Sequence, residues 1–155
     1  MSDPQQLHWS VFGFSELGTK LLYHVLRLRV DVFVVEQNCP YPEVDGRDPD
    51  ALHLVGQQAD GTVAAYARII PPQADGVPHI GRVVVAKEHR GIGLGKRVMQ
   101  EAFQVLRERY GSRRSAIAAQ TYLQQFYMDL GYVRTGDDYL WDGIPHVDMV
   151  LTEEF

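Results

Sequence analysis

The spacing of hydrophobic positions changes several times along the chain, and each change predicts a new element. Short apolar runs, rich in β-branched and aromatic residues, predict strands at residues 7–14, 52–56, 62–70, 80–86, 115–119, 132–135 and 147–151. Apolar residues at three- and four-residue spacing predict helices from Leu21 onward, over 93–110 and over 120–130. Asp60-Gly61 favours a hairpin turn between the second and third strands. This alternation predicts an α/β or α+β fold with helices on a central sheet.

The junction between the fourth strand and the second helix has the sequence of an anion-binding turn. Gly91, Gly93 and Gly95 lie between the predicted strand over 80–86, which is rich in β-branched residues, and the predicted helix. Glycines permit the backbone conformations and close approaches that such a turn needs. The unpaired N–H groups and the dipole of the helix start favour an anion here. Arg90 and Lys96 add positive charge on either side, so we expect this turn to bind phosphate.

Two common nucleotide-binding motifs do not fit this turn. A dinucleotide fingerprint needs G-x-G-x-x-G, but counting from Gly91 puts Lys96 at the last glycine, and counting from Gly93 puts Val98 there. A P-loop ends in G-K-[ST], whereas Arg97 follows Lys96. A kinase-like nucleotide enzyme is therefore disfavoured.

Composition fits one soluble globular domain over residues 1–155. The chain is 45% hydrophobic, which is enough for a packed core. Its formal net charge of −5 argues against a nucleic-acid partner, which normally selects a basic surplus. Cys39 is the single cysteine, so we expect neither a disulfide nor a metal. Residues 1–6 lack a signal-peptide pattern and no stretch approaches about 18 apolar residues, so a cytoplasmic protein without a membrane partner is expected.

The segment Arg90–Gly95 reads R-x-x-G-x-G and directly follows a hydrophobic strand. This arrangement resembles the acyl-CoA-binding motif of the GCN5-related N-acetyltransferase (GNAT) family, whose loop and helix start hold the CoA pyrophosphate. The resemblance implies acetyl-CoA as cosubstrate, with contacts from Arg90, Gly91, Ile92, Gly93, Leu94, Gly95 and Lys96. It also implies backbone contacts from Val83, Val84 and Val85, at a place where the strands of this family splay apart.

A second GNAT-like segment runs from Phe126 to Tyr132, with the sequence FYMDLGY. In that family an aromatic residue and a tyrosine precede leucine, glycine and another aromatic residue, and the helix lies beside the CoA pantetheine. The family tyrosine often serves as general acid, so Tyr127 is the candidate here. The family frequently has asparagine seven residues before this tyrosine, and Gln120 at that position is a candidate CoA contact.

The longest resemblance runs across Leu28 to Asp48. The segments LRVDVFVVEQ, CPYPE and DGRD look like the ElaA-type branch of the GNAT family, as does GIPH near the end. With the two motifs above, similarity covers most of the chain from about residue 20. It implies a GNAT-like central sheet, mixed but mostly antiparallel and twisted, of six to seven strands flanked by about four helices.

The chemistry that the resemblance implies is direct attack of an amine on the acetyl thioester. Backbone N–H groups near Val84 and Val85 would bond the carbonyl oxygen as it gains charge. The CoA thiolate then needs a proton or a strong hydrogen bond from Tyr127. Tyrosine has a reference pKa of about 10 and a thiol about 8.5, so full transfer is uphill by roughly 2 kcal/mol. Hydrogen-bond stabilisation is therefore an equal alternative to proton donation.

A protonated amine must also lose a proton, directly or through water. Glu36, His53 and His146 are the candidate bases, because each lies at an element end or on a strand that the fold could bring to a central cleft. Glu36 is the preferred candidate among them. His79, at the start of the key strand, is a weaker one.

An acidic loop is expected between Glu43 and Asp50, in which Arg47 is the single basic residue. Pro40 and Pro42 end the preceding helix. A solvated charge run is the default interpretation of such a loop. The competing interpretation is a mouth that recruits a cationic substrate.

The sequence therefore predicts an acetyl-CoA-dependent N-acetyltransferase that transfers an acetyl group to the primary amine of a small molecule or peptide. The alternative is a non-catalytic acyl-CoA-binding or regulatory module that keeps the phosphate turn. The amine acceptor is not identified by the sequence. Exposed strand edges make a homodimer a reasonable arrangement.

Overall fold

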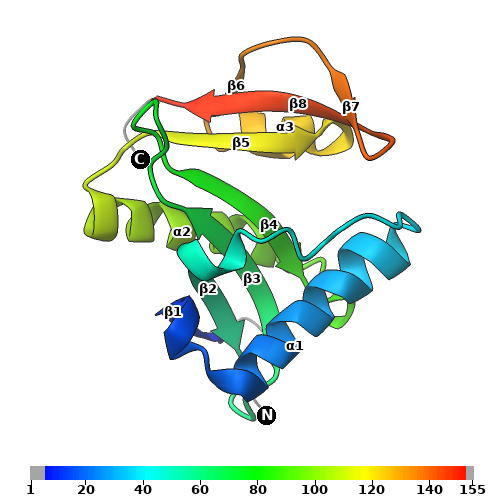
Figure 1. Ribbon diagram of the computed structural model, residues 1–155, viewed down its shortest axis with the longest axis vertical. Coiled ribbons are helices and arrows are strands. Elements are labelled where there is room, and N and C mark those ends of the chain that lie inside the picture. Colours follow the sequence, from blue (N-terminus) through cyan, green and yellow to red (C-terminus); the bar gives the residue numbers. More distant parts are fainter. Residues whose placement is uncertain (1–5, 153–155) are drawn as a thin grey trace.

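The computed structural model describes residues 6–152 and contains one eight-stranded sheet with three α-helices (Figure 1). The strands are β1 (His8–Gly13), β2 (Leu52–Gln57), β3 (Val63–Ile70), β4 (His79–Val85), β5 (Ser115–Gln120), β6 (Val133–Arg134), β7 (Tyr139–Trp141) and β8 (Ile144–Leu151). The helices are α1 (Gly18–Val30), α2 (Leu94–Tyr110) and α3 (Gln124–Met128). The ends of the expected 1–155 domain, residues 1–5 and 153–155, lie outside the described part, as does most of the segment examined for a signal peptide.

The sheet is mixed and mostly antiparallel, as expected. Its order is β1-β2-β3-β4-β5-β8-β6, with β7 pairing with β8 off this path. Among the pairings in residues 6–152, β4 with β5 is the parallel one. None of the helices in this part of the chain is both long and apolar enough to cross a lipid bilayer.

The element counts differ from the expected six to seven strands and about four helices. The additional strand β7 lies in the segment 136–145, which was interpreted as a loop. Asp142 and Gly143 have φ angles of 50° and 77°, and Trp141 pairs with Ile144 across them. A two-residue turn with positive φ at both positions is the favoured hairpin connection, and Asp-Gly is its usual sequence. The expected helix over 120–130 is also shorter, since a 3₁₀ turn at Thr121–Leu123 precedes α3.

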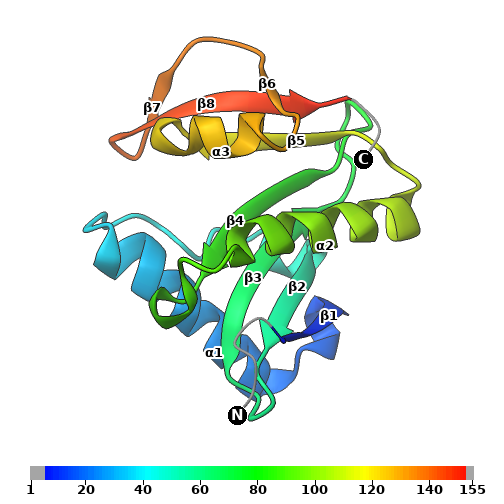
Figure 2. The ribbon, with the colours of Figure 1, turned by 180° about the vertical axis from the view of Figure 1, so that it is seen from behind.

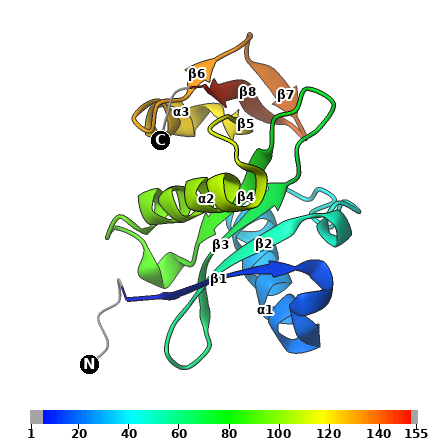
Figure 3. The ribbon, with the colours of Figure 1, turned by 90° about the vertical axis from the view of Figure 1, so that its left-hand side faces the viewer.

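Helices α1 and α2 cover opposite faces of the β1–β4 part of the sheet (Figure 2). Alternate residues of a strand point to opposite faces, and in β3 both sets are buried. Ala65, Ala67 and Ile69 pack with side chains of α2, whereas Tyr66 packs with side chains of α1. The side view shows these strands between the two helices (Figure 3). This double burial explains why β3 has a nearly continuous apolar sequence.

Strand β4 parts from β5 soon after it begins. The register between them joins His79 to Ala116, and beyond that point the two strands diverge (Figure 1). On its other side β4 pairs with β3, but the register shifts between Tyr66 and Arg68. Arg82, opposite this shift, has a φ of 50°, so β4 carries a β-bulge there. The second half of β4 consequently presents a free backbone edge in the interior of the molecule.

Helix α1 does not end at Val30 but continues as a wider π-helical turn over Asp31–Glu36. This agrees with the prediction that the helix runs toward Glu36. Turns of this kind occur most often at functional sites. Here the turn brings Glu36 and Gln37 beside the free edge of β4, where both line the cavity described below.

The segment from Glu43 to Asp50 is not the solvated or cation-recruiting loop that was expected. Its carboxylates Glu43 and Asp48 are buried and bind Arg29, a fully buried side chain of α1. Arg29 Nε donates to Glu43 Oε1 over 2.5 Å, and Nη1 donates to Asp48 Oδ1 over 2.7 Å. Burial alone would lower the pKa of Arg29, but the hydrogen bonds from its guanidinium to these carboxylates hold the pKa above its ordinary value. For Glu43 and Asp48 both interpretations as a free acidic surface are therefore wrong, whereas Asp50 is exposed.

Two further arginines complete this network, which we call the arginine–carboxylate cluster. It contains Arg29, Arg68, Arg82, Glu43, Asp45 and Asp48. The three arginines come from α1, β3 and β4, so the cluster ties the helix and the loop to the centre of the sheet. Three positive and three negative groups make it neutral overall, and it leaves no surplus of acid to attract a cation.

Candidate active site

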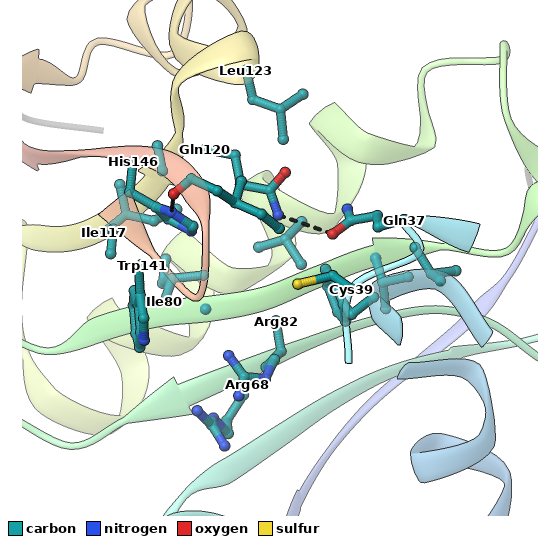
Figure 4. Close-up of a pocket in the computed structure, with 18 of the residues that line it drawn as sticks. Gln37, Cys39, Arg68, Ile80, Arg82, Ile117, Gln120, Leu123, Trp141 and His146 are labelled. Atoms are coloured by element: carbon teal, nitrogen blue, oxygen red, sulfur yellow. Dashed lines mark hydrogen bonds between the residues drawn. The ribbon is translucent and has the colours of Figure 1, made fainter. Parts of the chain in front are cut away.

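A cavity of about 430 Å³ occupies the opening between β4 and β5 (Figure 4). It is lined from the π-turn, β4, β5, α3 and the β7–β8 hairpin. Of the residues predicted to act, those that line it are Glu36, His79, Val83, Val84, Val85, Arg90, Gln120, Tyr127 and His146. His53 and the glycine-turn residues 91–96 lie outside its lining.

The glycine turn has the backbone geometry that its sequence predicts. Gly91 and Gly93 have φ angles of 86° and 80°, in the left-handed region that favours glycine. Gly93 precedes α2, and Arg97 N–H donates to Gly93 O over 3.2 Å. The amides of Leu94 and Gly95 therefore belong to the first turn, whose N–H groups have no acceptor within the helix. Lys96 is exposed beside them, so the turn has the donors and the charge to hold phosphate.

The first prediction concerns strain at Gly93. An L-residue in a left-handed conformation costs roughly 1–2 kcal/mol, so we expect Gly93→Ala to lower the free energy of unfolding by about that amount. The turn amides would also shift, and affinity for acetyl-CoA should fall about fivefold or more, equivalent to roughly 1 kcal/mol. Thermal or urea unfolding and calorimetric titration with acetyl-CoA measure the two effects.

Gly95→Ala is the matched control for stability. Its φ is not positive, and an added Cβ would lie 3.5 Å from the Phe126 ring, which is an ordinary contact. Alanine in a helix is favoured over glycine, so this variant should be at least as stable as the parent. Wild-type stability and affinity in Gly93→Ala would contradict the role of the turn geometry.

Arg90, the cation before the turn, is held by Glu36. Its Nη1 and Nη2 donate to the Glu36 carboxylate over 2.6 and 3.0 Å, and its Nε donates to Val85 O over 3.1 Å. The hydrogen bond from Arg90 holds the pKa of Glu36 below its ordinary value. The ion pair joins the π-turn to the end of β4. Glu36 is therefore ionised near neutral pH and has its oxygens occupied by Arg90.

The free edge of β4 presents backbone donors to the cavity. Ala86 N–H donates to Ala64 O of β3 over 2.8 Å. Successive residues of a strand direct their N–H groups to alternate sides, so those of Val85 and Val83 face the β5 side. Val85 O, on that same side, accepts the hydrogen bond from Arg90. The N–H groups of Val83 and Val85 thus point toward the place where β5 has moved away, whereas that of Val84, which was expected to act with Val85, faces β3.

Tyr127 reaches the same cavity from α3. Its side chain is buried, with ring centroids 5.0 Å from Phe126 and 5.8 Å from Tyr132. Burial raises the pKa of the Tyr127 hydroxyl above its ordinary value, so it stays protonated. Within residues 6–152 no group forms a hydrogen bond with this hydroxyl. A neutral, buried O–H group is thereby left free to donate to a molecule in the cavity.

The candidate bases His146 and His53 have different surroundings. His146 lines the cavity, and its Nδ1 lies 2.7 Å from Ile144 O. A carbonyl only accepts, so Nδ1 carries the proton and Nε2 keeps a lone pair in the neutral ring. His53 is fully buried, with its nitrogens 2.7 Å from Tyr66 Oη and 2.9 Å from Asp48 O. Burial lowers the pKa of His53, and both of its nitrogens are occupied within the protein.

Gln120 connects the two sides of the opening. Its Nε2 donates to Gln37 Oε1 over 3.2 Å, across 83 positions of sequence (Figure 4). Cys39 Sγ likewise lies 3.5 Å from Asp142 O in the β7–β8 turn. These two contacts join the segment after α1 to the β5–β8 side of the sheet. The cavity is thus bordered by elements that are remote in sequence.

Several cavity residues were not singled out in the sequence. Among them are Cys39, Tyr41, Arg68, Arg82, Trp141 and Ile144. The Asp142-Gly143 turn was a local signal for the hairpin that carries Trp141 and Ile144. No comparable signal marks Arg68 and Arg82, because isolated arginines on strands have no periodic pattern.

A bulged strand with a free edge, a splayed neighbour and a glycine turn at its end are together the features of an acyl-CoA-dependent acyltransferase. The comparisons with known proteins agree. A family model described as an acetyltransferase (GNAT) domain matches residues 31–153. The chain belongs to the GNAT family and, within it, to the ElaA-type branch.

Relatives from distant organisms match nearly the whole chain. A UPF0039 protein of Schizosaccharomyces pombe is 43% identical over 139 residues, covering 89% of this chain and 92% of that protein. Protein ElaA of Escherichia coli is 39% identical over 146 residues, covering 92% and 95%. The crystal structure of an acyl-CoA N-acyltransferase from Pseudomonas aeruginosa has 40% identity and a TM-score of 0.89, covering 94% of this chain and 99% of its own. Acyl transfer is therefore the general activity of this fold and site.

Proposed function

We propose that the protein is an acetyl-CoA-dependent N-acetyltransferase that acetylates a primary amine by direct attack. The observation that carries the proposal is that backbone N–H groups of β4 and the Tyr127 hydroxyl lie in the same cavity. The free edge of β4 directs the N–H groups of Val83 and Val85 into it, and Tyr127 contributes a buried hydroxyl without a protein partner. A site for thioester transfer needs both kinds of donor, one for the carbonyl oxygen and one for the leaving sulfur.

The cofactor side of the proposal rests on the glycine turn and the opening. The positive charge of Lys96 and the first-turn amides of α2 suit the pyrophosphate of CoA, and Arg90, which is paired with Glu36, lies at the start of this turn. Gln120 and the β4 edge border the opening in which the pantetheine arm would lie. Acetyl is proposed as the acyl group on the family resemblance, and a longer acyl chain is the outcome that a thioester comparison would reveal.

The proposed reaction balances without another reagent. The amine nitrogen attacks the carbonyl carbon, a C–N bond forms, and the carbonyl oxygen gains charge beside the β4 amides. The C–S bond then breaks, and the sulfur leaves as thiolate while Tyr127 O–H donates a hydrogen bond to it. Because burial raises the pKa of Tyr127 further above that of a thiol, a hydrogen bond is favoured over full proton transfer. The proton lost by the amine passes to a base, and CoA sulfur is protonated from solvent.

His146 is the base that we propose, acting directly or through water. It lines the cavity and its Nε2 retains a lone pair. Glu36 also lines the cavity, but its carboxylate is paired with Arg90, and its lowered pKa makes it a weaker base. His53 is outside the lining, and we propose that it supports the loop through Asp48 O.

The experiment that tests this function combines binding and turnover. Isothermal titration with acetyl-CoA should show one site, and release of free thiol should then be followed over a range of primary amines. Binding with transfer to at least one amine supports the proposal. Absence of binding would contradict both the enzyme and the alternative module, and binding without transfer to any amine would favour the non-catalytic acyl-CoA-binding module.

Two substitutions test whether His146 or Glu36 accepts the proton of the amine. His146→Gln should lower kcat/KM at pH 7 by roughly tenfold, a modest loss for a base because water can replace it. Glu36→Gln should change the dissociation constant of acetyl-CoA and leave kcat within about threefold. The reverse pattern, with kcat lost in Glu36→Gln alone, would assign the base to Glu36.

A cytoplasmic homodimer remains part of the proposal. Strands β1 and β6 lie at the two ends of the sheet order and offer edges for pairing. The mass of the protein in solution, measured by light scattering, would decide the oligomeric state.

A further inference from the structure

Two arginines border the cavity directly beside the free edge of β4. Arg68 comes from β3 and Arg82 from β4, and both line the cavity. Their Nη2 atoms lie 2.9 and 3.4 Å from the same oxygen, Asp45 Oδ2, so the guanidinium groups are neighbours. Figure 4 shows them together at one end of the cavity, away from Gln120 and Leu123.

The arginine–carboxylate cluster is neutral, but its charges are not evenly placed around the cavity. Arg68 and Arg82 line the cavity, whereas their partners Glu43, Asp45 and Asp48 do not. The carboxylates lie behind the arginines as seen from the cavity. A ligand in the cavity therefore lies closer to the guanidinium groups of Arg68 and Arg82 than to the carboxylates. These positive charges act on it at short range and are partly shielded from water.

These guanidinium groups also keep donors that no protein group uses. Arg68 Nε is buried without a hydrogen-bond partner in the described chain. Arg82 Nε lies 2.8 Å from Glu43 Oε2 but lacks the alignment of a hydrogen bond. Arg82 Nη1 forms no hydrogen bond within residues 6–152. The two Nε atoms have no exposed surface and so cannot meet a ligand, whereas Arg82 Nη1 is not fully buried and is the N–H group suited to a ligand oxygen.

The other charged groups of the cavity do not reverse this polarity. Glu36 is paired with Arg90, and Arg47 adds a further positive group to the lining. Asp142 is the remaining carboxylate of the lining, and it belongs to the exposed β7–β8 turn. A dicationic or polycationic acceptor would bring its second charge toward arginines, which is unfavourable in a partly buried site.

We propose that the amine acceptor carries its own carboxylate, bound by Arg82 with Arg68 behind it, as in a small amino acid. Guanidinium donors match carboxylate oxygens in geometry and charge. Arg82 is the bulge residue that immediately precedes Val83, whose N–H faces the site of the thioester carbonyl. The carboxylate would therefore lie only a few bonds from the attacking nitrogen. An internal peptide amine, such as a lysine side chain, has no carboxylate at that separation.

This inference rests on the proposed function and narrows its acceptor, so the test must separate the two. The wild-type protein, saturated with acetyl-CoA, is assayed for thiol release with matched acceptors: α-amino acids, their primary amides and the corresponding decarboxylated amines. Rates are compared per unprotonated amine, because removing the carboxylate changes the amine pKa. Aminoalkyl sulfonates and phosphonates form a further arm that distinguishes a carboxylate from other anions.

We expect kcat/KM to be at least about tenfold higher for an amino acid than for its amide, as for a hydrogen-bonded charge pair of about 1.5 kcal/mol or more. Equal or faster reaction of the amides and decarboxylated amines would overturn the inference and leave the acetyltransferase intact. A preference for the sulfonates or phosphonates would overturn the carboxylate assignment. Failure of every amine would overturn the proposed function instead.

In that last case a binding measurement still decides the anion site. An N-acetyl amino acid and its primary amide are titrated against the CoA-bound protein, and tighter binding of the acid by about tenfold supports the site. Equal binding of the two would overturn it. This measurement needs no turnover, so it does not depend on the chemistry.

Variants identify the side chain responsible. Arg82→Gln should remove most of the preference for the carboxylate, whereas Arg82→Lys should retain a part of it through the remaining charge. Arg27→Gln is the matched control, because Arg27 is exposed on α1 and pairs only loosely with Asp31, at 3.9 Å. Unfolding curves establish that each variant is folded, and an unchanged preference in folded Arg82→Gln would contradict the assignment.

Discussion

Tyr127→Phe is expected to lower kcat by roughly 10²- to 10³-fold, the usual contribution of a group that donates to a leaving atom. The reason is the position of the hydroxyl, which is buried in the cavity and has no protein partner. The affinity for acetyl-CoA should change by less than about threefold, because the phosphate turn and the β4 edge are untouched. Steady-state thiol release with saturating amine and calorimetric titration measure the two quantities.

Tyr132→Phe is the matched control for this change. Tyr132 is in the same aromatic group, but its hydroxyl lies 2.7 Å from Ser115 Oγ in the core and does not line the cavity. Its removal should cost about 1–3 kcal/mol of stability by leaving Ser115 unpaired, while kcat is kept. If Tyr127→Phe turns over at the wild-type rate with saturating amine, Tyr127 has no part in the mechanism.

Arg29→Met is expected to lower the free energy of unfolding by about 3–5 kcal/mol, the usual cost of breaking a buried ion pair from one side. Arg29 is fully buried and binds both Glu43 and Asp48, so the change leaves two buried carboxylates with less compensating charge. In a domain of this size the melting temperature should fall by roughly 6–20 °C. Urea unfolding and calorimetric melting measure this loss.

Arg27→Met, on the same helix, provides the comparison. Arg27 and Asp31 have side chains 66% and 60% exposed and lie 3.9 Å apart, so their pair should contribute well under about 1 kcal/mol. A loss for Arg29→Met as small as that for Arg27→Met would mean that Arg68 and Arg82 already neutralise the loop. The cluster would then not depend on α1.

The same cluster sets the response to acid. Burial opposes ionisation of Asp45, but hydrogen bonds and charge from Arg68 lower the pKa of Asp45 to about 2. A carboxylate with a lowered pKa contributes its stability fully above its unfolded pKa of about 3.9, and that stability is lost as the pH falls toward the folded value. Acid should therefore destabilise the protein mainly between about pH 4 and pH 2. The effect should be smaller in Arg29→Met, because part of the cluster has already been lost.

Local patterns were sufficient for most of the elements and for the conformation of the glycine turn. The predicted strands at 52–56 and 80–86 and the helix over 93–110 match β2, β4 and α2 closely. The positive φ angles of Gly91 and Gly93 follow from residues within one turn of chain. The same holds for Gly111, which ends α2 with a φ of 58°. The family and the fold were equally accessible, because their motifs are short and continuous in sequence.

The prediction failed where the partners lie far apart in sequence. The acidic loop was interpreted as solvated or substrate-binding because its neighbours in sequence include only Arg47. Its actual partners lie 14 residues away for Arg29 and Glu43, and 20 for Arg68 and Asp48. The bases show the same limit, since Glu36 and Arg90 are 54 residues apart and their pairing removes the preferred candidate's free oxygens.

By itself the sequence determined the class of protein, the order of its main elements and the conformation of the glycine turn. These features depend on backbone preferences and hydrophobic periodicity, which act over a few residues. The tertiary structure decided which side chains share the cavity, which charges are already neutralised, and which donors remain free. Those properties arise when β4 parts from β5 and when α1 and the loop pack against β3 and β4, because burial and charge pairing depend on distance in space.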